Sequence, residues 1–159
     1  MLAHDDNHPI AALTFPSLTY ESFVRFELPR GKHQPLDVRF MAQSAGVLEL
    51  TIYDNSVFEA PGTLLRTETV KLSAGELSDG HDGRWVVDDL RAMPPMEGVL
   101  WIGLRMTDGS PAIWTAAGPG GQTFLRDRDP THGVGLLPVK RSLMLRLDVD
   151  TDLPGAHDK

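Results

Sequence analysis

The sequence contains no cysteine. It therefore forms no disulfide bond, thiolate zinc site or iron–sulfur cluster, and it offers no cysteine nucleophile. Basic residues are outnumbered, 15 against 22 acidic ones, which leaves a formal net charge of -7. Because a negatively charged protein is repelled by phosphate backbones and by anionic lipid surfaces, we expect no nucleic-acid partner.

Long apolar runs are also missing. None approaches the roughly 18 residues of a membrane-spanning helix, so we expect no insertion into a membrane. The first nine residues carry acidic and imidazole groups where a secretory signal has a basic region followed by an apolar run, so no export signal is expected. These observations predict a soluble protein and leave its compartment open.

Helix-length amphipathic windows are scarce, whereas 15 glycines and 12 prolines punctuate short apolar segments. This spacing is typical of strands joined by turns. Residues 22–28, 36–42 and 47–54 alternate polar and apolar side chains, which predicts neighbouring antiparallel strands, and residues 143–149 alternate most regularly. Residues 99–107 are largely apolar on both faces, which predicts a central strand with Trp101 in the core.

Weaker strand candidates bring the total to about nine, a number that two packed sheets accommodate. These candidates are residues 64–72, 84–90, 112–117 and 122–126. Residues 108–111, Asp-Gly-Ser-Pro, are predicted to form a hairpin loop. The expected fold class is thus all-β, a two-sheet antiparallel β-sandwich or jelly roll. Residues 1–159 are expected to form a single domain whose polar ends, residues 1–12 and 151–159, are flexible.

Histidines and acidic loops are the candidate metal ligands. The six histidines lie in separate loops or near the ends of the chain, whereas zinc needs three or four convergent ligands, so we expect exposed histidines and no metal site. The acidic residues Asp79, Asp82, Asp88 and Asp89 offer oxygen ligands for Ca²⁺. They lack the ligand spacing of a helix-loop-helix calcium loop, and Asp-Gly pairs are common in turns. We expect no cofactor, with a structural calcium ion as the less favoured alternative.

Catalytic motifs are absent from the sequence. No serine stands in a Gly-x-Ser-x-Gly elbow, and the glycine-rich residues 118–121 contain a proline and lack the lysine and hydroxyl pair of a phosphate-binding loop. We therefore expect a non-enzymatic protein whose function is to bind another molecule.

Aromatic residues make up only 7% of the chain, so each can be weighed as a stacking surface for a sugar ring. Trp85 and Trp114 lie beside turn-rich segments and, together with Tyr53, are the predicted stacking residues. Asn55, Arg84 and Gln122 are the predicted polar donors beside them. Packing in the core is the favoured interpretation of Trp85 and of Trp114, so their assignment as stacking residues depends on exposure near a sheet end.

Five short segments in the middle of the chain share a pattern of strand end, turn, strand, tryptophan and glycine-flanked strand: residues 52–54, 60–65, 70–72, 85 and 98–104. In this pattern the chain resembles bacterial extracellular β-sandwich accessory modules of the carbohydrate-binding-like or anchor type. The resemblance runs through residues 22–149. It implies an extracellular, non-catalytic jelly roll that binds a glycan or cell-surface polymer, or that packs against a neighbouring domain.

A structural or decoration subunit of a larger assembly, held by protein contacts, is the alternative function. Homo- and hetero-oligomers stay open under both functions. A glycan-binding module should gather its aromatic residues and polar donors in one concavity. An assembly subunit should instead expose an apolar patch or an unpaired sheet edge.

Overall fold

The computed structural model describes residues 2–3, 9–14, 19–72, 84–116, 122–127, 136–139 and 142–150. Over these residues the chain is all-β, as predicted, with ten strands paired in antiparallel fashion. The described part of the chain has no helix that could cross a bilayer. The strands are β1 (Pro9–Thr14), β2 (Tyr20–Glu27), β3 (Pro35–Asn55), β4 (Pro61–Leu72), β5 (Arg84–Asp89), β6 (Val99–Ala116), β7 (Thr123–Asp127), β8 (Leu137–Val139), β9 (Ser142–Leu143) and β10 (Leu145–Val149).

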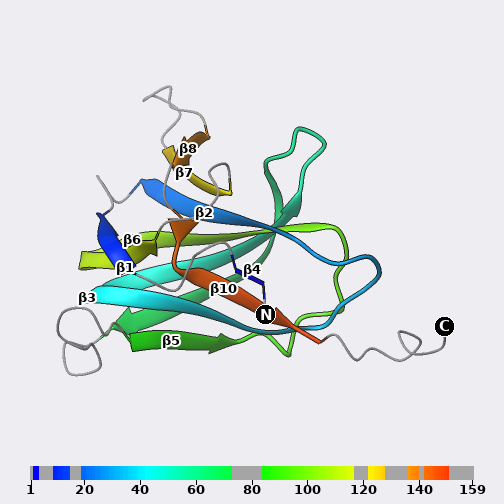
Figure 1. The fold of residues 1–159 in the computed structure, drawn as a ribbon, viewed down its shortest axis with the longest axis horizontal. Coiled ribbons are helices and arrows are strands. Elements are labelled where there is room, and N and C mark those ends of the chain that lie inside the picture. Colours follow the sequence, from blue (N-terminus) through cyan, green and yellow to red (C-terminus); the bar gives the residue numbers. More distant parts are fainter. Residues whose placement is uncertain are drawn as a thin grey trace.

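Two long strands, β3 and β6, organise the sheet (Figure 1). The strand order is β10-β3-β6-β2-β7-β8, with β4 and β5 added to β3, and β1 and β9 added to β6. The amino-terminal half of β3 pairs with β5 and β10, whereas its carboxy-terminal half pairs with β4 and β6. Each long strand therefore belongs to both layers of a sandwich-like sheet that folds over on itself.

The passage between layers occurs where Gly46 of β3 lies opposite Gly109 of β6, amid three shifts of register. Gly109 has a φ of 72°, and a Cβ on Gly46 would collide with the ring of Pro111. The prediction of a hairpin loop at residues 108–111 is wrong, because β6 continues through them. Glycine and proline mark an irregular bend in a strand here rather than a reversal of the chain.

Other strand predictions need smaller corrections. Residues 36–42 and 47–54 belong to one strand, and β2 pairs with β6 and β7 instead of with β3. Residues 143–149 are divided at Met144 between β9 and β10. The amino-terminal stretch predicted to be flexible contains most of β1 and a bridge between Leu2 and Leu147, while residues 151–159 lie outside the described part of the chain.

The main core fills the space between the layers. It joins alternate residues of β3 from both halves, such as Phe40 and Leu50, to Phe26 of β2 and Leu145 of β10. Full burial of each such side chain stabilises the fold by about 1.5–3 kcal/mol. Period-two alternation has its expected result in β3 and β10, whose alternate residues enter the core.

Candidate functional site

A second apolar cluster lies on the other face of the layer that contains β2, β6 and the end of β3. Phe23, Tyr53 and Trp101 form it, with Phe124 of β7 packed against them. Phe23 meets Tyr53 edge-on at 5.7 Å between ring centroids and Trp101 at 6.5 Å. Trp101 has no exposed surface, which confirms its prediction as a core residue, and its indole Nε1 donates to Oδ1 of Asn55 at 2.9 Å.

A buried carboxylate lies beside these rings. Glu21 of β2 is fully buried and accepts hydrogen bonds from Thr51 Oγ1 at 2.7 Å and from the Tyr53 hydroxyl at 3.1 Å. Arg126 of β7 reaches the same carboxylate at 3.4 Å and lies 4.7 Å from the centre of the Phe23 ring. A Cβ on Gly103 would touch Thr51, Glu21 and Phe23, so the absent side chain makes room for the network. This face is a closed, hydrogen-bonded structure rather than an open binding platform.

The predicted ligand-binding residues fall in two places. Tyr53 and Asn55 lie at the end of β3. The carbonyl of Gln122 accepts a hydrogen bond from the amide of Arg25 in β2. Arg25 lies opposite Trp101 of β6, which in turn lies opposite Tyr53. These three predicted residues therefore share one end of one layer. Trp85, which is on β5, instead packs against Met41 and Met144. The guanidinium of Arg146 lies 4.4 Å from the centre of the Trp85 ring.

Strand pairing also separates the remaining predicted residues from that end. Arg84 starts β5 opposite Ala42, and Trp114 lies in the carboxy-terminal part of β6 opposite Ala12. The side chains of Arg84 and Trp114 lie outside the described part of the structure. The strand positions of Trp85 and Trp114 do not place them beside Tyr53 and Asn55.

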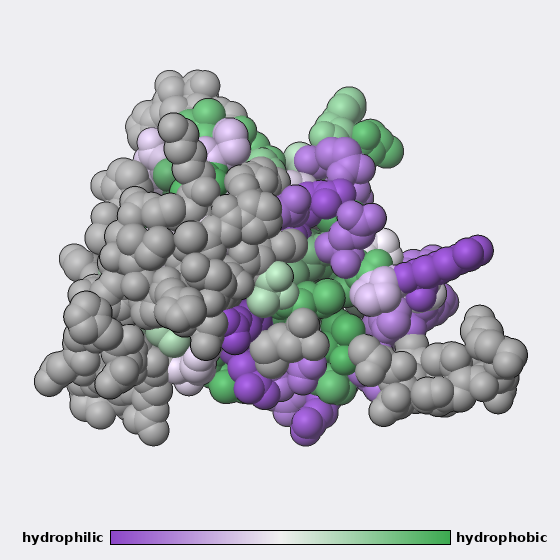
Figure 2. All heavy atoms as spheres, viewed as in Figure 1, coloured by the Kyte–Doolittle hydropathy of each residue, from purple (hydrophilic) through white to green (hydrophobic). Residues whose placement is uncertain are grey.

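Sequence reasoning missed an exposed apolar tip on the loop between β3 and β4. Val57 is 92% exposed and Phe58 86% exposed. The loop projects from the ribbon in Figure 1, and hydrophobic atoms stand at the end of the same projection in Figure 2. The signal was present in the sequence as two adjacent apolar residues between Ser56 and Glu59, where a turn favours polar residues. We call Val57 and Phe58 the apolar tip.

Hydrogen bonds hold this loop in one shape. The Ser56 hydroxyl oxygen accepts bonds from the amides of Phe58 at 3.2 Å and Ala60 at 3.3 Å. Glu59 has a φ of 55°, and its carboxylate accepts bonds from Asn55 Nδ2 at 3.3 Å and Arg25 at 3.1 Å. The apolar tip is therefore presented by an ordered loop, which lowers the entropic cost of any contact that it makes.

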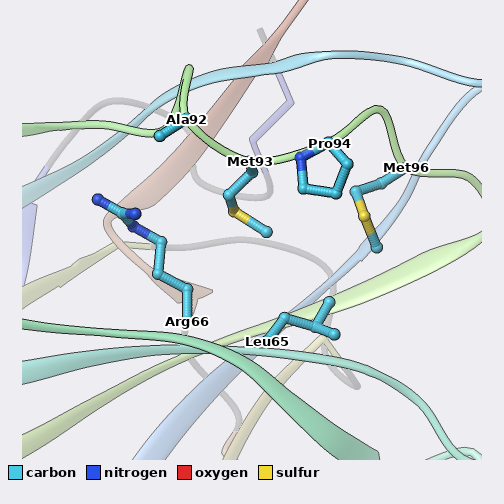
Figure 3. A pocket seen from close by; sticks show the side chains of 6 residues that line it. All are labelled: Leu65, Arg66, Ala92, Met93, Pro94 and Met96. Carbon is cyan, nitrogen blue, oxygen red and sulfur yellow. The ribbon is translucent and has the colours of Figure 1, made fainter.

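A pocket opens farther along β4. It has a volume of about 220 Å³ and is lined by Leu65, Arg66, Ala92, Met93, Pro94 and Met96. Figure 3 shows Leu65 approaching from β4, and Met93 and Met96 approaching from the segment after β5. Leu65 is 39% exposed and Pro94 is exposed, so the pocket reaches the surface. Within the described residues, the other edge of β4 pairs with no strand.

Arg66 is the charged residue among those that line the pocket. Arg66 donates to Glu68 and to the carbonyl of Asp89, yet its Nε is buried without a hydrogen-bond partner among the described residues. Burial raises the pKa of Asp88, and the nearby Glu68 carboxylate raises it further, while Arg66 opposes both effects. In contrast to the Glu21 network, the polar groups at this edge are only partly satisfied.

Metal ligands do not gather in the described part of the chain. No group of three histidine, aspartate or glutamate residues there is arranged to hold an ion, and the predicted calcium ligands Asp79 and Asp82 lie outside it. The prediction that His33 is exposed is wrong. Its ring is buried between the carbonyls of Asp150 at 3.1 Å and Arg30 at 3.3 Å, because its backbone pairs with Met96. The other five histidines lie outside the described residues.

Comparisons with protein-family models, with curated proteins and with solved structures found no match for this chain.

Proposed function

We propose that this chain is a non-catalytic β-sandwich subunit that is held to another protein chain through its β4 side. The observation that carries this proposal is the apolar tip, because Val57 and Phe58 are almost fully exposed on an ordered loop. Burying a phenylalanine removes about 150–250 Å² from water, and exposed aromatic side chains are enriched at protein interfaces. Among the described residues, one edge of β4 pairs with no strand, and this edge adds backbone donors and acceptors beside the tip.

The glycan-binding alternative has less support from the aromatic residues. Tyr53 is buried and donates its hydroxyl proton to Glu21, and Trp101 is fully buried. Neither ring presents an open face on which a sugar could stack. Because these rings are buried, we rank protein binding ahead of glycan binding, the opposite of the order that the sequence alone favoured.

One observation keeps a glycan as the second candidate. Trp85 is only partly buried on β5, although Arg146 lies over its ring. A glycan array that detects a ligand, with binding lost in Trp85→Ala and retained in Phe58→Ala, would favour this function. Binding that is insensitive to Trp85→Ala would show that Trp85 is not the stacking residue, and an array without any ligand would remove the function.

Site-specific photocrosslinking tests the first function. A photoreactive phenylalanine analogue replaces Phe58 in cells that make the protein, and the same analogue replaces Leu137 as a control. Leu137 is 50% exposed on β8, at the end of the strand order away from β3. We expect discrete protein adducts from position 58 and none from position 137. Absence of adducts from position 58, or equal adducts from both positions, would contradict the proposal.

A further inference from the structure

The chain carries a small pocket with both polar and apolar lining as well as an apolar tip, and the two match in size. A buried cavity of about 150 Å³ lined by aliphatic and aromatic side chains accommodates benzene, which has the size of a phenylalanine ring. The pocket at Leu65, Met93 and Met96 measures about 220 Å³, so it has room for the ring of Phe58. It is smaller than the 300–1,000 Å³ typical of sites for drug-sized ligands.

The chemistry of the pocket also suits an aromatic ring. Met93 and Met96 bring two thioethers to its wall, and sulfur makes favourable contacts with aromatic rings. Methionine side chains are unbranched and flexible, so the wall can adapt to an inserted side chain. The ring of Phe58 is therefore a chemically appropriate occupant.

Charge is complementary at the two places. Glu59 follows the apolar tip directly and has a side chain that is 65% exposed. Arg66 lines the pocket but is already paired with Glu68, whereas the exposed Arg91 stands next to Ala92 in the pocket wall. The acidic Glu59 beside the tip and the guanidinium group of Arg91 beside the pocket would attract one another across an interface and fix its register.

The tip cannot fill the pocket of its own chain. Leu65 lies four residues beyond the start of β4, a distance of about 13 Å along an extended strand. Because β4 is hydrogen-bonded to β3 from Pro61 onward, the loop is directed away from the pocket. Any tip that enters this pocket belongs to another molecule.

We infer that two copies of this chain associate by inserting the apolar tip of each into the pocket of the other. The inference rests on the proposed function and names a second copy as its partner. Since tip and pocket both lie on the β4 side, a two-fold axis lets both insertions form at once, as in most homodimers. Two small insertions bury less surface than a standard interface, so we expect a dissociation constant of about 10–100 μM.

Sedimentation equilibrium of the full 159-residue chain tests this inference. We expect a reversible rise from monomer to dimer mass between about 1 μM and 1 mM, which is lost in Phe58→Ser and unchanged in the matched surface variant Leu137→Ser. A wild-type protein that remains monomeric at about 1 mM would overturn the inference. So would a dimer that Phe58→Ser leaves intact.

A mixing experiment distinguishes specific insertion from general stickiness. Ala92→Trp fills the pocket from its exposed wall, and Leu65→Glu serves as a second pocket variant if the first is misfolded. Phe58→Ser retains the pocket, whereas Ala92→Trp retains the tip. We expect each to be monomeric alone, and an equimolar mixture at about 1 mM to contain a small but detectable fraction of heterodimer, because the one remaining insertion keeps about half of the free energy of association. A mixture at about 1 mM with no more association than either variant alone would contradict the inferred contact.

Charge neutralisation supplies a third measurement. Glu59→Gln, which keeps an acceptor for Asn55, and Arg91→Gln should each weaken the dimer by about two- to five-fold, and the double variant should lose little more than either single variant. Additive losses would show that these charges do not meet across the interface and would overturn the inferred register.

Failure of this inference can be separated from failure of the proposed function. If the purified chain is monomeric while the photoreactive residue at position 58 links to a different polypeptide, the proposed function stands and the second copy is excluded as its partner. If position 58 links to no protein at all, both fail. Adducts that contain the pocket segment of this same chain would support both.

Discussion

Aromatic side chains occur in two contrasting settings on either side of the end of β3. Tyr53 and Trp101 are buried. The Tyr53 hydroxyl donates a hydrogen bond to Glu21, and the Trp101 indole donates one to Asn55. A few residues farther along the chain, Phe58 stands almost fully exposed on a loop whose backbone is held by Ser56. The contrast teaches that aromatic content alone does not locate a binding surface. A ring with every partner inside the chain contributes to stability, and an exposed ring on an ordered loop is available to another molecule.

The largest expected effect separates the two settings directly. Trp101→Ala should lower the free energy of unfolding by about 3–5 kcal/mol, because it leaves a cavity and an unpaired Asn55 oxygen. Phe58→Ala should change it by less than about 0.5 kcal/mol, as is usual for an exposed side chain. Urea unfolding followed by circular dichroism measures both. Similar losses for the two variants would abolish the distinction.

The next prediction concerns the space that Gly103 leaves for the hydrogen-bonded network around Glu21. Gly103→Ala places a methyl group against Thr51, Glu21 and Phe23, and overpacking of this kind costs about 1–3 kcal/mol. Tyr53→Phe removes only the hydroxyl that donates to Glu21 and should cost about 1 kcal/mol. Urea midpoints of the two variants give the order. If Gly103→Ala were as stable as the wild type, the network would be looser than its distances indicate.

The order of the exposed loop gives a smaller effect. Ser56→Ala removes the acceptor of the amides of Phe58 and Ala60 and should cost about 0.5–1.5 kcal/mol. Amide hydrogen exchange at these two positions should accelerate, while Ser56→Thr, which keeps a hydroxyl, should preserve their protection. Equal exchange in both variants would mean that the backbone alone holds the loop.

The same contrast explains what the sequence could predict. Alternation identified segments of β2, β3, β6 and β10 and placed Trp101 in a central strand, because burial on one or both faces leaves a local pattern, but it missed β1 and β8. It did not reveal that residues 36–42 and 47–54 form one strand or that β6 runs through residues 108–111, since glycine and proline mark bends and turns alike. The pocket joins Leu65 to Met93 and Met96 across two connections, and such proximity leaves no local pattern.

The smallest effect concerns the unsatisfied polar groups at the β4 and β5 edge, which contrast with the fully bonded Glu21. Burial raises the pKa of Asp88 above its ordinary value, so the native state binds more protons than the unfolded state between these two values. Stability contributed by this group therefore falls as pH rises through that window, and the penalty is complete above the folded pKa. Asp88→Asn removes the ionised form and should raise the melting temperature at pH 7 by about 1–3 °C.

That gain should disappear as pH falls below the ordinary carboxyl pKa, where Asp88 is protonated in both states. Glu97→Gln, a neutralisation at an exposed position near the same edge, should show no such dependence. Melting curves from pH 3 to 7 measure the difference. A lower melting temperature for Asp88→Asn at pH 7 would mean that attraction to Arg66 outweighs desolvation. A gain would mean that the edge bearing the pocket gives up stability that the covered aromatic face retains, as is common where a surface serves binding.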